Sequence, residues 1–178
     1  MITSKENTLY LIIKQNYFDD ILMGSQKQES REINNTSYNR YLDTWENDGE
    51  VYLYIDKKKL QMNNLHQSSN NPMIYNNGDY PFIPIKYQFL NLVAEYNENR
   101  DSMIIAVENI HFETIKGKDG KDARFSNDTE RMKIDKNGEL CIWQVVYTLG
   151  EIVETDLKRD RAQGTITECI NIAKTKKL

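Results

Sequence analysis

TLYLIIKQNYFDDILMGSQKQESREI, residues 8–33, is the stretch of sequence that decides the fold. Its first part, residues 8–14, is β-branched and aliphatic and is bounded by polar residues, so it predicts a short buried strand. The next part predicts a helix over residues 17–23. Asn16 is its expected N-cap, and Gly24 supplies the left-handed conformation that ends it.

The last part of this stretch, residues 26–33, is polar throughout. Side chains alternate between the two faces of a strand, so a strand here places one set of charges on a single face: Lys27, Glu29 and Arg31. The other face carries Gln28, Ser30 and Glu32. The pattern therefore predicts a charged strand that has no core face.

A second helix is predicted over residues 37–45, because apolar side chains recur there at helical spacing, namely Tyr38, Tyr41, Leu42 and Trp45. Helical spacing is typical of core residues, although aromatic rings also stack on nucleic-acid bases. Asp48 and Gly49 then predict a break before a strand at residues 51–55.

Residues 57–81 are rich in Asn, Ser and Gly without a sustained period, which predicts a long loop or insertion. Residues 87–96 and 102–115 predict a hairpin whose connection is residues 97–101. A charged excursion over residues 116–138 precedes the last predicted strand, which spans residues 139–148 and continues through 151–154.

Strands outnumber helices in this pattern, and both helices come early in the chain. We therefore expect an α+β fold: a mainly antiparallel, bent β-barrel of about five or six strands, with short helices packed at one end. Residues 1–155 are expected to form one domain that contains the insertion at 57–81. Residues 156–178 are expected to form a C-terminal extension.

Composition excludes several classes of protein. The chain has 178 residues and a net charge of -4, which excludes a generally basic nucleic-acid coat but is compatible with a local basic groove. The apolar run at residues 9–13 is too short for a signal peptide or a membrane span, so we expect a cytoplasmic protein or a component of a phage particle. No metal or cofactor is expected, because the candidate ligands lack metal-site spacing: His66, His111, Cys141 and Cys169.

The block of strand, helix ending in glycine and charged strand resembles the opening of ASCH domains, members of the PUA-like superfamily. Their charged strand follows the pattern G-K-K-T-x-E-x-R, and Gly24, Glu29 and Arg31 stand at matching positions. The later segments at residues 87–107 and 143–154 are similar to strands of Bacteroidetes and phage ASCH-like proteins. The resemblance covers residues 8–154 and implies the PUA-like form of the bent barrel.

The resemblance implies binding of RNA or a nucleotide-like ligand in a cleft beside the strand at residues 26–33. The expected ligand-binding residues are Lys27, Glu29, Arg31 and Arg100. An arginine can fork onto a phosphate or a base edge, and a glutamate can accept a hydrogen bond from an exocyclic amine. The residues alone also fit a solvated edge strand whose charges prevent aggregation. Arg100 and Asp101 equally fit a solvated turn.

Two other functions fit the sequence. The insertion at 57–81 and the C-terminal extension suit a structural or interaction protein, because docking elements are commonly added as loops and termini. Part of the superfamily hydrolyses acylated cytidine with a lysine and a threonine at positions occupied here by Gln26 and Glu29. Neither residue can do that work, so this amidohydrolase activity is not expected, unless a shift of one residue restores Lys27 to the lysine position.

Overall fold

The computed structural model describes residues 3–34, 36–55, 58–61, 74–76, 82–95, 100–126, 133–134, 138 and 140–158. These residues are mostly β-strand, with one α-helix and one 3-10 helix among them, which confirms the expected sheet-rich fold. The chain divides into two compact units. Unit 1 comprises residues 1–27, 87–108 and 149–178, and unit 2 comprises residues 28–86 and 109–148.

Unit 1 is built on three neighbouring strands, β1 (Thr8–Ile13), β7 (Phe89–Ala94) and the first part of β8 (Ser102–Thr114). β1 and β7 are parallel, whereas β7 and β8 form the predicted antiparallel hairpin. Parallel neighbours need a long crossover between them, and here the chain between β1 and β7 supplies it. The hairpin connection runs over residues 95–101, slightly longer than predicted.

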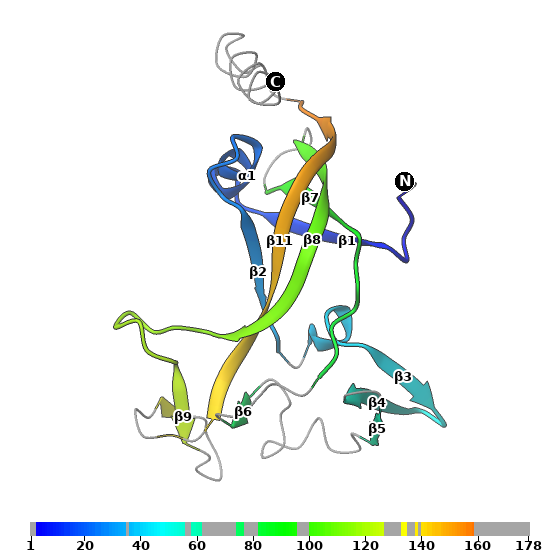
Figure 1. Ribbon diagram of the computed structural model, residues 1–178, viewed down its shortest axis with the longest axis vertical. Coiled ribbons are helices and arrows are strands. Elements are labelled where there is room, and N and C mark those ends of the chain that lie inside the picture. Colours follow the sequence, from blue (N-terminus) through cyan, green and yellow to red (C-terminus); the bar gives the residue numbers. More distant parts are fainter. Residues whose placement is uncertain are drawn as a thin grey trace. The chain divides into compact units, whose positions relative to one another are not determined.

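The first helix, α1 (Gln15–Leu22), follows β1 directly (Figure 1). It buries Phe18 and Ile21, as its spacing predicts. The predicted N-cap is wrong: Lys14 occupies that position without a side-chain cap, and Asn16 lies inside the helix. The predicted C-terminal glycine is confirmed, since Gly24 has a φ of 77° and donates its backbone N–H to the carbonyl of Ile21.

Most of the buried strand residues of unit 1 lie on one face of its sheet. Alternate residues of the three strands are almost fully buried there, and the register places them side by side. These residues are Leu9, Leu11, Ile13, Leu90, Leu92, Ala94, Met103 and Ile105. Burying this many aliphatic side chains supplies the main driving force for folding.

Unit 2 contains the charged strand, β2 (Gln28–Glu32), which pairs in antiparallel fashion with β11 (Leu140–Asp156). The last strand is confirmed as continuous through Gly150. Nearer its start, β11 pairs with β6 (Ile74–Asn76) and β9 (Arg124–Ser126). β9 also pairs with β10 (Lys133–Ile134).

A separate sheet in unit 2 consists of β3 (Thr44–Asn47), β4 (Glu50–Ile55) and β5 (Lys58–Gln61). The β3–β4 turn is formed by Asp48 and Gly49, whose φ values of 54° and 78° give the twist that a two-residue hairpin requires. The predicted chain break at these two residues is therefore a tight turn.

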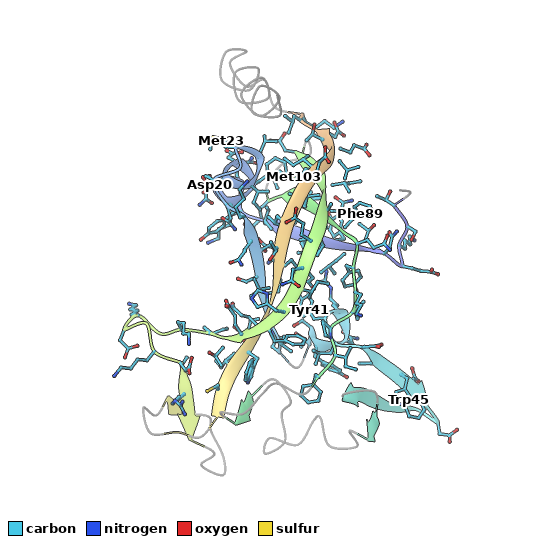
Figure 2. The ribbon with its side chains drawn as sticks, viewed as in Figure 1. Asp20, Met23, Tyr41, Trp45, Phe89 and Met103 are labelled. Carbon is cyan, nitrogen blue, oxygen red and sulfur yellow. The ribbon has the colours of Figure 1, made fainter. Side chains whose placement is uncertain are left out.

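The helix predicted over residues 37–45 is wrong. A 3-10 helix covers Tyr38–Arg40 only, and Trp45 lies on β3, paired with Tyr52. Figure 2 shows Tyr41 near this helical turn and Trp45 out on β3. A single helical turn is enough to account for the apolar spacing, because it already buries Tyr38, Tyr41 and Leu42. Strand pairing then takes the following residues away from the helix.

Three predictions fall partly outside the described residues. The insertion at 57–81 is predicted to be a loop, which is wrong for β5 and β6, and the rest of that range lies outside the described residues. The charged excursion at 116–138 contains β9 and β10. Of the C-terminal extension, residues 156–158 are described, so its boundary stays a prediction. No helix in the described ranges is long and apolar enough to cross a membrane.

Candidate functional site

The charged face of β2 has a buried end, contrary to the prediction. Glu29 is 6% exposed, whereas Gln28, Ser30 and Glu32 on the other face are exposed. The register explains this burial: Glu29 lies opposite Tyr147 and Arg31 lies opposite Val145, and both of these β11 residues are fully buried. The β2 face that was predicted to be wholly polar therefore covers part of the apolar interior of unit 2.

Glu29 and Arg31 form an ion pair. Arg31 Nε lies 2.9 Å from Glu29 Oε1, and the two side chains are 28% and 8% exposed, respectively. Residues two apart on a strand point the same way, which is why the sequence spacing alone brings them together. The carboxylate is thus held inside while the guanidinium reaches the surface.

Burial raises the pKa of Glu29 above its ordinary value, and the nearby Arg31 guanidinium opposes that shift. Loss of water around a carboxylate disfavours its charged form, and a cation close by favours it. The net upward direction means that desolvation outweighs the ion pair. A carboxylate with this perturbation is a functional-site candidate, although structural ion pairs also perturb pKa values.

Tyr41 lies close enough to the pair to interact with both charges. Its pKa is raised, chiefly by burial, while Arg40 and Arg31 lower it and Glu29 raises it. Arg40 also stands over the Tyr41 ring, with its Cζ 5.9 Å from the ring centroid. Glu29, Arg31 and Tyr41 therefore form one polar and aromatic cluster, which we call the β2 cluster.

The other two predicted ligand-binding residues belong to unit 1. Lys27 is exposed, and its Nζ lies 3.5 Å from the point where a Cβ on Gly24 would stand, at the C-terminal end of α1. Arg100 is exposed beside the buried Asp101. Their grouping with Glu29 and Arg31 stays a prediction.

Asp101 is not the solvated turn residue that one interpretation expected. It is 1% exposed, and its Oδ1 accepts the backbone N–H of Lys158 at 2.9 Å. Its Oδ2 accepts a longer hydrogen bond of 3.4 Å from Gln15 Nε2. Asp101 therefore holds α1, the β7–β8 connection and the end of β11 together within unit 1.

A second charged cluster in unit 2 was missed by sequence reasoning. Asp122 accepts hydrogen bonds from Thr114 Oγ1 and Lys116 Nζ, and its Oδ2 lies 3.9 Å from Arg124 Nη2. These hydrogen bonds lower the pKa of Asp122. The signal in the sequence was the alternation of lysine, glycine and aspartate over residues 116–122, which predicts a tight turn and hence two strands that pair.

Among the described residues, no group of three or more His, Cys, Asp or Glu side chains is placed to hold a metal ion. Cys141 is a buried free thiol, and His111 lies on β8 with its Nε2 3.9 Å from Glu113 Oε2. The remaining candidate ligands of the sequence, His66 and Cys169, lie outside the described residues.

Comparison with known proteins finds no family model, no curated protein and no solved structure that matches the chain.

Proposed function

We propose that this chain is an ASCH-like protein with a PUA-like barrel, and that it binds RNA or a nucleotide-like ligand at the β2 cluster. The observation that carries the proposal is the Glu29–Arg31 pair, in which a buried carboxylate stands beside a partly exposed guanidinium at 2.9 Å. The match of Gly24, Glu29 and Arg31 to the ASCH pattern supports the same assignment.

The chemistry of the pair suits a nucleotide. The Arg31 guanidinium presents several N–H donors in a plane, which complements a phosphate or the acceptor edge of a base. The Glu29 carboxylate accepts hydrogen bonds from an exocyclic amine. Because the carboxylate is desolvated, an amine that reaches it gains a stronger interaction than it would make in water.

Burial of Glu29 also gives a reason to favour binding over a purely protective edge strand. A charge that only prevents aggregation needs to remain in water, whereas taking a carboxylate out of water costs free energy. The raised pKa of Glu29 is the sign of that cost. Proteins accept such a cost at sites where a charged group meets a ligand.

The test is binding of nucleosides, nucleotides and short RNAs, measured by isothermal titration calorimetry at low salt. Arg31→Ala is expected to weaken binding by about 10- to 100-fold, corresponding to the roughly 1.5–3 kcal/mol of a charged hydrogen bond. Glu29→Gln is expected to lower the affinity for ligands that carry an exocyclic amine more than the affinity for ligands that lack one, because an amide is a poorer acceptor than a carboxylate.

Two further variants keep this result interpretable. Arg31→Lys keeps the positive charge near Glu29 but removes the fork, so it separates ligand recognition from the folding effect of an unpaired carboxylate. Lys86→Ala removes an exposed positive charge of unit 2 and serves as the matched control. Equal affinities for the control and the Arg31 variants would contradict the site, and an absence of binding by the unaltered chain would contradict the function.

A further inference from the structure

The β2 cluster and the Asp122 cluster lie on the same face of the unit 2 sheet. Gln144 Nε2 donates to Glu113 Oε1 at 2.8 Å, so these two side chains share a face. Side chains alternate along strands, so Val145 on β11 and Thr114 on β8 point to the opposite face. Arg31 lies on the same face as Val145, because the two residues are paired in the β2–β11 register. The Thr114–Asp122 hydrogen bond lies on this face as well.

Arg124 extends this face along β11. It lies opposite Cys141 in the β9–β11 register, and its Nη1 donates to the carbonyl of Gly138 at 3.3 Å. Cys141 is an even number of residues from Val145, so Arg124 projects on the same side of the sheet as Arg31. Both arginine side chains are partly exposed, at 29% and 28%.

Beyond Arg124 and Lys116, the chain forms a short ordered arm between β8 and β9 (Figure 1). Lys116 and Asp122 form a bridge at its base, and Gly117 donates its N–H to the Lys121 carbonyl at 2.7 Å. Lys118 and Lys121 are exposed on this arm. Residues 116–124 contain four basic and two acidic residues, a local excess of positive charge in a chain of net charge -4.

Arg31 and Arg124 are too far apart to meet at one phosphate. Val145, opposite Arg31, and Cys141, opposite Arg124, are four residues apart on β11, which is about 13 Å at roughly 3.3 Å per residue. Lys118 and Lys121 are exposed on the arm that follows Lys116. A ligand that meets all of these charges must therefore carry several anionic groups in a row.

We propose that unit 2 binds the sugar-phosphate backbone of a single RNA strand several nucleotides long, with one nucleotide at the β2 cluster and the following phosphates at Arg124 and the arm. This inference rests on the proposed function and specifies its ligand as an oligonucleotide in place of a free nucleotide. The positive charges are Arg31, Lys116, Lys118, Lys121 and Arg124, which we call the cationic surface. Phosphate contacts of this kind add affinity without selecting a sequence.

The experiment compares a uridylate decamer with uridine 5′-monophosphate by fluorescence anisotropy or competition over a range of salt concentrations. The decamer is expected to bind more tightly and with a steeper salt dependence. The double variant Lys118→Ala/Lys121→Ala is expected to reduce the slope of log K against log salt by about 1.4, since each phosphate contact on a single strand contributes about 0.7. Binding of the monophosphate is expected to be unchanged.

The matched control is Lys5→Ala/Lys86→Ala, which removes two exposed lysines outside the arm and makes the same change in net charge. Equal slopes of log K against log salt for the two double variants would overturn this inference. If Arg31→Ala still weakened binding, the proposed role of the β2 cluster would stand. Equal affinity of the unaltered chain for decamer and monophosphate would also overturn it. Tighter binding of a polyglutamate peptide than of the decamer would assign the surface to an acidic protein partner instead, and no binding of any ligand would reject the proposed function as well.

Discussion

Glu29 combines two opposing effects at the scale of a single residue. Its burial raises its pKa, and Arg31 at 2.9 Å only partly opposes that effect. The folded chain therefore binds a proton on the Glu29 carboxyl group more tightly than the unfolded chain does. By linkage, the contribution of Glu29 to stability is greatest below its ordinary pKa of 4.5 and is lost as pH rises from there through the raised pKa of the folded state.

We expect Glu29→Gln to remove this pH dependence. As pH rises from about 4 to about 7, the variant should become more stable relative to the unaltered chain, as measured by the free energy of unfolding. The reason is that glutamine carries no charge to desolvate. Urea unfolding at a series of pH values measures this difference. Glu46→Gln is the control, since Glu46 is exposed. A pH-independent difference for Glu29→Gln, or the same curve for both variants, would contradict the burial argument.

At the scale of an element, Gly150 lets β11 lie close against β8. A Cβ at this position would stand 2.8 Å from Glu108 Cγ and 3.3 Å from the Ala106 carbonyl oxygen, so a side chain here would collide with β8. The sequence predicts that the last strand continues past this glycine, and the element runs unbroken from Leu140 to Asp156. The glycine therefore permits close approach of two strands.

We expect Gly150→Ala to lower the free energy of unfolding by about 1–3 kcal/mol, the usual cost of forcing an added methyl group into a packed position. Thermal unfolding followed by circular dichroism measures the loss. The shortest contact is to a flexible side chain, so Gly150→Ala/Glu108→Ala should recover part of the stability, whereas Glu108→Ala alone should change it little. A Gly150→Ala variant as stable as the unaltered chain would show that the strands tolerate the methyl group.

At the scale of the whole molecule, Asp101 links segments that are far apart in sequence. It accepts hydrogen bonds from Gln15 near the start and from Lys158 after β11, and all three residues belong to unit 1. A buried carboxylate with two such donors closes the unit by side-chain chemistry in addition to strand pairing. This long-range role explains why Asp101 is 1% exposed although it lies next to the exposed Arg100.

Asp101→Ala is expected to reduce the free energy of unfolding on the order of 1–3 kcal/mol, because two donors lose their acceptor. Asp101→Asn keeps an acceptor oxygen for the Lys158 N–H and should lose less. Urea unfolding measures both variants, with Glu6→Ala as an exposed acidic control. Equal stability of Asp101→Ala and the control would mean that these hydrogen bonds are replaced by water without cost.

Local signals succeeded where neighbouring residues set the structure. The residues of β1 and α1 carried their own pattern of apolar spacing, and Gly24 marked the end of the helix. The helix predicted at 37–45 failed because its apolar spacing also fits a single turn followed by a strand, and pairing of Trp45 with Tyr52 decided between them. That pairing depends on a partner strand, which a local pattern does not contain.

The sequence by itself determined the alternation that places Glu29 and Arg31 on one face of a strand, because residues two positions apart in a strand share a face. Only the tertiary structure decided that Glu29 is buried, since burial comes from the opposing Tyr147 on a strand more than one hundred residues later. It likewise brought Arg124 and Lys116 to the face that holds Arg31. Register between distant strands fixes such neighbours, and register is set by the packing of the whole sheet.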